Sequence, residues 1–343
     1  MTTRTTEALD AFSVPEDLVA TAPRHPRDAV RLLVAGRATI EHERFTALPE
    51  HLTAGDLVVV NTSATLPAAV TGHLGAVDVT VHFSTALDET TWVVEVRPAG
   101  HADGPLAGVG PGNVVVLADC VALTVLAAHP AGQSRLWRAQ LEVEGSVLAF
   151  LQRVGRPIRY GYVPGAHPLA DYQTIFAREP GSAEMPSAAR PFTPEIVTSL
   201  VTRGVLVAPI VLHTGVSSQT AGEPPQPERF AVPAATARVV NLTHSSGGRV
   251  VAVGTTVTRA LESALDDSGM VRAAAGWTDL VLGPQRPARV VTGLITGWHE
   301  PGASHLHLLT AVAGEGLVRR AYRAALRERY LWHEFGDSCL LLP

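Results

Sequence analysis

The chain has 343 residues, of which 46% are hydrophobic and 17% charged, so it is long enough for two domains and apolar enough to bury a substantial core. All 27 cationic side chains are arginines; without lysine the protein has neither a Schiff-base nucleophile nor the lysine of a phosphate-binding P-loop. The net charge is −5, but residues 1–150 hold 9 arginines against 17 acidic residues, whereas residues 151–343 hold 18 against 15. The acidic N-terminal half argues against wrapping by nucleic acid there, whereas the C-terminal half could still contact phosphates locally; the charge balance alone does not decide the function.

The N-terminal residues MTTRTTEALDAFSVPEDL contain no apolar core of the kind that a signal peptide needs. The longest apolar stretch, 114–128, is interrupted by Asp119 and is too short to span a bilayer. Cys120 and Cys339 are 219 positions apart and form no CxxC motif, which argues against a disulfide framework and a cysteine zinc site. These features predict a cytoplasmic protein without a membrane segment.

The first expected element is a buried strand at 57–60, where the sequence is LVVV. From about residue 66 to 144, short β-rich runs alternate with turns rich in glycine and proline, a texture typical of a small all-β barrel. The runs lie at 76–83, 92–97, 113–118, 121–128 and 136–143. No segment among them is long and periodic enough to predict a helix.

A short helix is expected at 145–153, and after it the pattern alternates between strand and helix. Helices are expected at 194–203, 233–245, 256–264 and 317–330, and several of them have proline in the first turn. Strands are expected at 205–212, 249–253, 279–282 and 290–295. A loop is expected at 217–226. The predicted fold class is α/β, with an inserted all-β barrel domain. Residues 1–64 plus 153–343 form the expected α/β catalytic domain, and residues 65–152 form the barrel.

The segment GGRVVAVGTTVTRALE at 247–262 predicts a strand ending at Val253, a glycine turn, a threonine N-cap and a helix. A turn of this kind directs free backbone N–H groups and the positive end of the helix dipole towards a bound ligand. Arg259 and Glu262 are three residues apart and share one face of the expected helix. An ordinary capped helix with a surface ion pair is the alternative interpretation.

Two further places offer candidate site residues. GWTD at 276–279 supplies a stacking surface, Trp277, and a carboxylate, Asp279, which could act as an acid of raised pKa, bind a ribose hydroxyl, or simply cap a turn. His213 follows the strand expected at 205–212, and α/β sheets bind ligands outside the carboxyl ends of their strands. A structural histidine is the alternative at that position.

His299, His305 and His307 suggest a metal site, but neither an HExxH motif nor a matching carboxylate accompanies them, so no metal is predicted. His305 and His307 would share one face of a strand but lie on different faces of a helix. On the helix expected at 317–330, arginines at 319, 323 and 327 recur every four residues. They form either a solvated face or a stripe that contacts phosphates.

Eleven sequence blocks, taken in order, resemble the S-adenosylmethionine:tRNA ribosyltransferase-isomerase family of queuosine biosynthesis. The likeness extends from about residue 12 to the C-terminus with collinear spacing. The blocks are PRHPRDAVRLLV (23–34), GDLVVVN (55–61), LPA (66–68), WVVEVRPAG (92–100), DYQTIFA (171–177), GSAEMPSAARPFTPE (181–195), VLHTG (211–215), GGRVVAVGTTVTRALE (247–262), GWTD (276–279), VTGLITGWHEPGAS (291–304) and FGDSCLLL (335–342).

The resemblance implies an α/β domain with an inserted barrel, and a reaction on tRNA. In this reaction the ribosyl part of S-adenosylmethionine is transferred and rearranged onto 7-aminomethyl-7-deazaguanine at the wobble position, giving epoxyqueuosine while adenine and methionine leave. The resemblance further implies that S-adenosylmethionine is the cosubstrate and that no metal is required. By this resemblance Thr255, Thr256, Arg259 and Trp277 would bind the cosubstrate. His213, Glu262 and Asp279 are the catalytic candidates, with Asp279 also placed to bind the nucleoside.

The chain departs from the family pattern in polar blocks. Asn-Asp-Thr-Arg-Val stands here as NTSAT at 61–65, Pro-Thr-Ala-Gly-Leu-His-Phe-Thr as PSAARPFT at 186–193, Gly-x-Gly-Thr-Phe as GVSSQ at 215–219, and Asn-Phe-His-Leu-Pro as GWHEP at 297–301. With these departures from the family pattern, three functions stay open. The first is the family reaction on tRNA, and the second is that of a divergent S-adenosylmethionine-using enzyme with a small acceptor such as a free 7-deazapurine. The third is that of a non-catalytic relative that binds a nucleoside or RNA. The sequence does not specify an oligomeric state.

Overall fold

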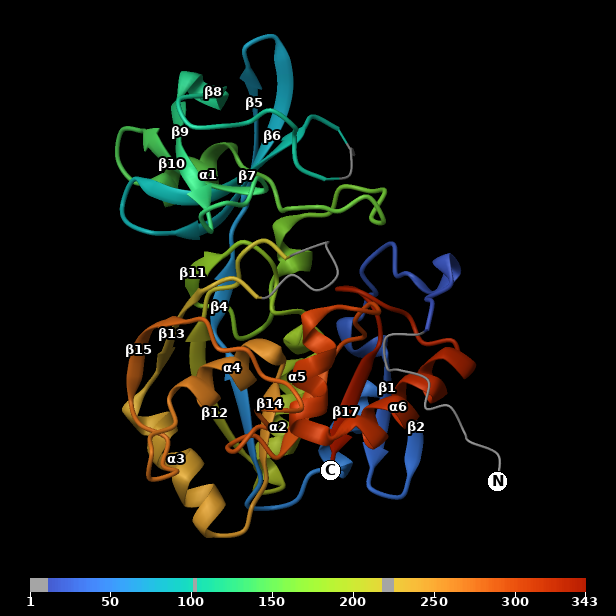
Figure 1. The fold of residues 1–343 in the computed structure, drawn as a ribbon. Helices are drawn as coiled ribbons and strands as arrows, with labels where there is room; N and C mark the ends of the chain where they lie inside the picture. The colour runs from blue at the N-terminus through green and yellow to red at the C-terminus, as the bar shows by residue number, and fades with distance from the viewer. Residues whose placement is uncertain (1–11, 101–103, 218–224) are drawn as a thin grey trace, which may run out of the picture. The chain divides into compact units, whose positions relative to one another are not determined.

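The computed structural model describes residues 12–100, 104–217 and 225–343 (Figure 1). Contacts divide the chain into two compact units. The first, called the sheet unit, comprises residues 1–61, 187–211 and 220–343, and the second, called the barrel unit, comprises residues 62–186 and 212–219. The chain thus enters the barrel unit directly after residue 61 and again at residue 212.

The sheet unit is built on a nine-stranded mixed sheet. The strand order is β15 (Ala274–Thr278), β13 (Glu228–Val232), β12 (Leu206–Leu212), β3 (Leu57–Asn61), β14 (Val250–Val253), β16 (Gly293–Thr296), β17 (Ser338–Leu342), β1 (Arg31–Gly36) and β2 (Ile40–Arg44). Strands β12, β3, β14 and β16 run parallel to one another. Every residue of β3 and β14 is buried, which explains their continuous apolar sequences.

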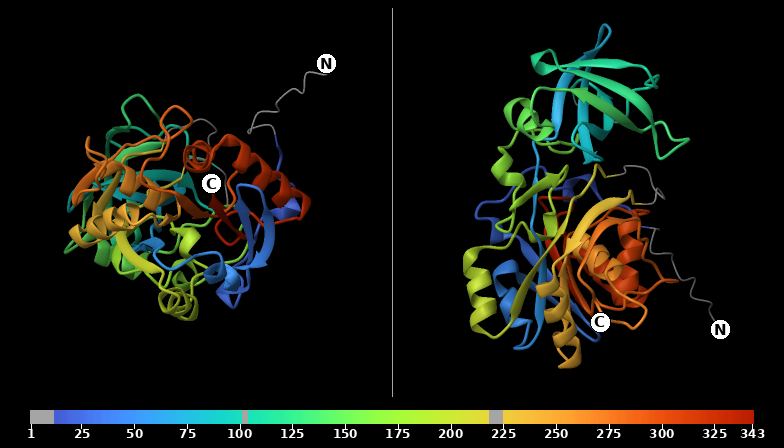
Figure 2. Two further views of the ribbon diagram at one scale, coloured as in Figure 1. Left: turned by 90° about the horizontal axis from the view of Figure 1, so that it is seen from below. Right: turned by 90° about the vertical axis from the view of Figure 1, so that its left-hand side faces the viewer.

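Helices lie on both faces of this sheet (Figure 2). They are α2 (Pro194–Thr202), α3 (Ala234–Ser245), α4 (Thr255–Ser263), α5 (Ser304–Ala313) and α6 (Glu315–Arg327). Helix α2 begins with proline at its first position, and the Thr193 side chain accepts a hydrogen bond from the N–H of Ile196. Helix α6 buries Leu317, Ala321 and Ala325 on one face, as its sequence predicts.

The barrel unit contains a closed six-stranded antiparallel barrel. Its strand order is β10 (Leu136–Glu142), β7 (Thr91–Pro98), β6 (Val77–Ala86), β5 (Ala69–Leu74), β8 (Val114–Leu117) and β9 (Ala122–His129). Phe83, Trp92 and Phe150 belong to the cluster that fills it, the last from helix α1 (Val147–Val154). Outside the barrel, β4 (Ser63–Thr65) and β11 (Glu179–Ser182) form a parallel pair.

The expected fold class, α/β with an all-β barrel, is confirmed. The strand at 57–60, the five β runs and the helices at 145–153, 194–203, 233–245, 256–264 and 317–330 all appear within a few residues of their expected limits. Contacts group 62–64, 153–186 and 212–219 with the barrel, whereas the sequence places them in the α/β domain. The domain limits 1–64 plus 153–343 and 65–152 stay a prediction.

The strand expected at 279–282 is wrong, because the strand in this region is β15 at Ala274–Thr278. Leu280 and Leu282 are buried, as their apolar character predicts, but they are not in a strand. The reason is a side chain: Nε and Nη2 of Arg259 donate hydrogen bonds to the carbonyls of Leu280 and Thr278, at 3.1 Å each. The Leu280 carbonyl, which a strand would use in its ladder, is therefore bound by a guanidinium.

The carboxylate of Asp56 joins the beginnings of β3 and β14. It accepts hydrogen bonds from the N–H of Thr53 at 2.8 Å, from the N–H of Arg249 at 3.0 Å and from the Arg249 guanidinium. Burial alone would raise the pKa of Asp56, but these hydrogen bonds outweigh it and hold the pKa below its ordinary value. Because the folded pKa is the lower one, the charged carboxylate stabilises the fold above the unfolded pKa, and this stabilisation is lost as the pH falls through the folded pKa.

We therefore expect Asp56→Asn to lower the free energy of unfolding at pH 7 by about 2–4 kcal/mol. The difference between wild type and variant should shrink when both are unfolded in urea near pH 3. Asp267→Asn, at an exposed position, is the control and should leave stability nearly unchanged at both pH values. An equal Asp56→Asn effect at pH 7 and pH 3 would contradict the prediction.

Candidate functional site

The parallel strands of the sheet unit end at a common edge, which we call the carboxyl edge. It is marked by Asn61, the last residue of β3, by Gly254, which follows β14, and by Gly297, which follows β16. Open α/β sheets bind their ligands at such an edge, near the point where the strand order reverses. Here the chain adds β12 on one side of β3 and β14 on the other, so the reversal lies at β3.

Helix α4 starts at this edge directly after Gly254. Gly254 has φ of 92° and ψ of 163°, a conformation that is nearly restricted to glycine, and its N–H donates to the carbonyl of Ile295 at 2.8 Å. The expected threonine N-cap is wrong: the N-cap is Gly254, and no side chain caps the helix. The first-turn N–H groups therefore have no side-chain acceptor at the cap. The hydroxyl of Thr256 is contacted by the Asn61 amide at 3.4 Å.

Arg259 lies on α4, but its guanidinium is buried against the antiparallel strand pair β13–β15. It forms an ion pair with Glu228 and donates to the carbonyls of Gln226, Thr278 and Leu280. The alternative interpretation of the sequence, a surface ion pair between Arg259 and Glu262, is wrong. Both side chains are buried, and each has other partners. These contacts attach α4 to the end of the sheet that carries β15.

The Glu262 carboxylate accepts four hydrogen bonds from three consecutive backbone N–H groups. The donors are Arg289, Val290 and Val291, at 2.8–3.0 Å, in the segment that leads into β16. These hydrogen bonds hold the segment 289–291 against helix α4. The catalytic assignment of Glu262 is untested by this geometry and stays a prediction.

Trp277 and Asp279 lie at the β15 edge of the sheet. The Trp277 side chain is 45% exposed, and Asp279 is exposed just after the strand. Helix α4 reaches β15 through Arg259 and through Ser263, whose hydroxyl lies 2.5 Å from that of Thr278. An exposed indole of this kind is free to stack on a planar ligand.

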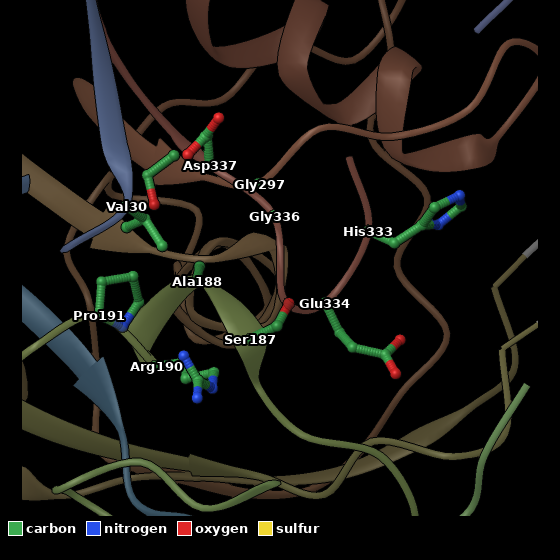
Figure 3. Close-up of a pocket in the computed structure, with 11 residues that line it drawn as sticks. Val30, Ser187, Ala188, Arg190, Pro191, Gly297, His333, Glu334, Gly336 and Asp337 are labelled. Carbon is green, nitrogen blue, oxygen red and sulfur yellow. The ribbon is translucent and has the colours of Figure 1, made fainter. Parts of the chain in front are cut away.

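A hollow opens at the carboxyl edge beside β16 and β17 (Figure 3). It has about 270 Å³ of space not filled by atoms, part of it open to solvent. Arg190, buried at 2% exposure, forms part of one wall together with Pro191, and His333 and Glu334 lie on the other side. Its remaining lining residues are Val30, Ser187, Ala188, Gly297, Gly336, Asp337 and Ser338.

No sequence motif marks these lining residues as site residues. The only signal was indirect: most of them fall in the family-like blocks 181–195, 291–304 and 335–342. Asp337 fixes one wall, because its carboxylate accepts the N–H groups of Arg31 and Leu331 at 2.8 Å each. The Arg190 guanidinium carbon lies 5.3 Å from the centre of the Phe335 ring.

His213 belongs to the barrel unit. Its Nδ1 lies 2.7 Å from the hydroxyl of Ser63, which in turn lies 2.6 Å from the hydroxyl of Ser182. A side chain at Gly181 would collide with the imidazole, so this glycine provides the space that the ring occupies. The ring is therefore held in a defined orientation, with Nδ1 hydrogen-bonded, as a proton-transfer group requires.

A second polar cluster of the barrel unit surrounds Glu184. Tyr160 donates its hydroxyl to the Glu184 carboxylate, and the N–H and hydroxyl of Ser217 bind the same group at 2.8 and 2.5 Å. Burial raises the pKa of Glu184, against the opposing effect of the Ser217 and Tyr160 hydrogen bonds. Glu184 could not be predicted from the sequence, because no local motif marks it.

His305 and His307 prove to lie on helix α5, with His305 partly buried and His307 exposed on another face. Within residues 12–100, 104–217 and 225–343, neither belongs to a group of metal-ligand geometry. Among the described residues, one such group is found, formed by Glu41, Glu43 and His51 on and near strand β2. The absence of a metal requirement stays a prediction.

Comparison with known proteins identifies the family. The model of the family described as queuosine biosynthesis protein matches residues 9–341. The chain belongs to this family. Two relatives are named S-adenosylmethionine:tRNA ribosyltransferase-isomerase: the protein of Symbiobacterium thermophilum is 35% identical over 96% of this chain and 98% of its own length, and that of Moorella thermoacetica is 35% identical over 96% and 98%.

A solved structure supports the assignment to the queuosine biosynthesis family. It is the crystal structure of S-adenosylmethionine tRNA ribosyltransferase from Thermotoga maritima, which is 29% identical, covers 96% of this chain and 99% of its own, and superposes with a TM-score of 0.55. The resemblance inferred from the eleven sequence blocks is confirmed. No helix in the described part of the chain is both long and apolar enough to cross a membrane.

Proposed function

We propose that this protein transfers and isomerises the ribosyl group of S-adenosylmethionine onto 7-aminomethyl-7-deazaguanine in tRNA, giving epoxyqueuosine, adenine and methionine. The observation that carries the proposal is the match of the queuosine biosynthesis family over residues 9–341, with relatives of this activity at 35% identity along nearly the whole chain. The carboxyl edge supports it, because the glycine turn and uncapped first turn of α4 provide N–H donors suited to a polar cosubstrate.

The chemistry determines which groups the site needs. The sulfonium makes the neighbouring ribose carbons acidic and electrophilic, so the reaction needs a base and a positioned acceptor amine. Adenine is a poor leaving group as an anion and requires a proton. We place S-adenosylmethionine at the start of α4, with Thr255 and Thr256 as ligands and Trp277 as a stacking surface.

Other assignments keep the status of predictions. His213 is the catalytic candidate whose ring orientation is best defined, through Ser63. The contacts of Arg259 and Glu262 favour positioning roles for these two residues, and Asp279 remains a nucleoside-binding and catalytic candidate. S-adenosylmethionine as sole cosubstrate, the lack of a metal and a cytoplasmic location are likewise part of the proposal.

The proposed activity is tested by incubating the protein with S-adenosylmethionine and tRNA that carries 7-aminomethyl-7-deazaguanine. Mass spectrometry should detect adenine and methionine in equal amounts, and epoxyqueuosine in the digested tRNA. A parallel reaction contains the free 7-aminomethyl-7-deazaguanine base in place of tRNA. Adenine release only with the free base would move the protein to a small-molecule acceptor, and release with neither would indicate a binding protein without this activity.

A tRNA acceptor requires phosphate contacts, and α6 offers a basic stripe of Arg319, Arg323 and Arg327, the last two exposed. Glu315 and Glu328 partly neutralise it. Arg319/Arg323/Arg327→Ala should weaken tRNA binding at least ten-fold and reduce the slope of log K against log salt by about 2–3. The measurement is a titration of labelled tRNA at several salt concentrations.

A variant of equal charge change serves as the control for this titration. Arg203, Arg229 and Arg238 are exposed elsewhere on the sheet unit, and their replacement by alanine should leave both affinity and slope close to wild type. If the two triple variants lose affinity equally, general electrostatics rather than the α6 stripe binds tRNA.

A further inference from the structure

Two histidines of the sheet unit lie face to face. His299 follows β16 by three residues, and His305 is the second residue of α5. Their ring centres are 4.5 Å apart and the ring planes differ by 8°, so the imidazoles are stacked in parallel. The turn at 297–303 between β16 and α5 makes this arrangement possible.

The surroundings of the pair fix its orientation. Nε2 of His299 lies 3.0 Å from the hydroxyl of Thr296, and its backbone N–H donates to the hydroxyl of Tyr322 on α6 at 3.3 Å. Among the described residues, no protein group hydrogen-bonds to Nδ1 of His299. That nitrogen is the one able to exchange a proton with a ligand.

Charged and titratable groups approach the pair from several elements. His333, which lines the hollow, acts on His299 and pairs with Glu300 at 3.2 Å. Arg259 of α4, paired with Glu228 of β13, acts on His305. Tyr322 supplies a neutral hydroxyl from α6.

Both imidazoles are neutral near pH 7. Burial lowers the pKa of His299 well below its ordinary value, and the nearby His305 and His333 lower it further. Burial together with Arg259 lowers the pKa of His305 to about 4. Two positive rings at this separation would repel strongly, so the pair takes up one proton far more readily than two.

The pair lies at the carboxyl edge, next to the start of α4. Val253 of β14 is paired with Ile295 of β16, and the Ile295 carbonyl accepts the N–H of Gly254. His299 follows Ile295 by four residues, so a neutral imidazole stands beside the place where we expect S-adenosylmethionine to bind.

We propose that His299 carries the proton in the ribosyl-transfer reaction and that His305 is a positioning residue, which keeps His299 neutral and oriented. This proposal rests on the proposed function. His299 takes a proton from the ribose carbon next to the sulfonium, and the electron pair of the C–H bond stays on that carbon. The resulting imidazolium gives its proton to adenine, which leaves with the electron pair of the ribose–adenine bond, while the ring oxygen donates a lone pair to the carbon that adenine leaves. The proton of the ribose carbon thus ends on adenine.

The test compares the wild type with His299→Gln, His305→Phe and His307→Phe. Glutamine can still reach Thr296 but cannot act as a base, so adenine release in single turnovers should fall at least 100-fold. Binding of S-adenosylmethionine, measured by calorimetry, should stay within three-fold, which shows that the variant is folded. Phenylalanine at 305 keeps the stacked ring but removes the second titrating group.

The pH dependence of adenine release distinguishes a positioning role of His305 from a role in packing alone. Adenine release requires neutral His299, so the rate falls as the pH drops through its pKa. In His305→Phe this acid limb should move to higher pH by at least half a unit, and an NMR titration should show the same rise in the His299 pKa. His307→Phe, on the exposed face of α5, should leave the limb in place.

Each other result overturns a defined part of the proposal. His299→Gln activity within five-fold of wild type would exclude proton transfer by His299, and an unmoved acid limb and NMR pKa in His305→Phe would exclude the role of His305. If the wild type itself releases no adenine with either acceptor, the proposed function fails and proton transfer by His299 fails with it. The NMR titration still decides whether His305 controls the charge of His299.

Discussion

Arg259→Ala is expected to lower the free energy of unfolding by about 3–5 kcal/mol, because it removes a buried guanidinium that pairs with Glu228 and donates to three backbone carbonyls. Chemical denaturation measures the effect. A double variant, Arg259→Met with Glu228→Leu, should recover much of the loss, since it removes both charges and refills the space with apolar atoms. Arg238→Ala, at an exposed position of α3, is the control and should change stability by less than about 0.5 kcal/mol.

The same variants test the cosubstrate role that the sequence suggests for Arg259. If Arg259 bound S-adenosylmethionine directly, Arg259→Ala would weaken this binding by about 1.5–3 kcal/mol and would not lower the stability of the protein. We expect instead that Arg259→Ala mainly lowers stability. The double variant, Arg259→Met with Glu228→Leu, should bind the cosubstrate nearly as well as the wild type. A stable Arg259→Ala protein that no longer binds S-adenosylmethionine would restore the ligand interpretation.

Gly254→Val is expected to abolish detectable S-adenosylmethionine binding and adenine release. At φ of 92° and ψ of 163° a branched residue is strained by about 1–3 kcal/mol, so residue 254 should leave this conformation and displace the first turn of α4. The space itself is not limiting, because the nearest contact of an added Cβ would be the Ala188 methyl at 3.4 Å. Calorimetry with S-adenosylmethionine measures the loss.

Gly247→Val is the matched control for this substitution. Gly247 also has a positive φ, 76°, but it precedes β14 at the opposite end of the strand and an added Cβ would meet no atom within 4 Å. It should lose a similar amount of stability and keep its affinity for S-adenosylmethionine. Equal losses of affinity in both variants would show that the start of α4 has no special role.

The sequence predicts those elements whose local signals agree with their tertiary setting. Helix α2 has proline at its first position and an apolar stripe, and β3 is an unbroken apolar run between turn residues. Strands β1 and β17 were not predicted, although RLLVAG and SCLLL contain short apolar runs like that of β3. Helix α5 was not predicted, since no capping side chain marks its start.

The site is harder to predict from the sequence than the fold, because its residues are far apart in the chain and come together only in the folded protein. Ser63 and His213 are 150 positions apart, and Arg259 reaches Glu228 across 31 positions. The glycine turn before α4 was recognisable, since a strand, a glycine and a helix follow directly in the sequence. The stacking of His305 on His299 was not, because it depends on the path of the turn between β16 and α5.

The two outer strands of the nine-stranded sheet differ in their resistance to aggregation. Strand β2 presents IEHER, four of whose five residues are exposed and three charged, and such side chains discourage pairing with another chain. Strand β15 presents AAGWT, uncharged and with Trp277 exposed, and the Arg259 guanidinium holds the chain where it leaves this strand. When Arg259 is lost, intermolecular strand addition should therefore begin at β15 and not at β2, and a lysate of that variant should yield insoluble protein in which residues 274–278 are protected from proteolysis.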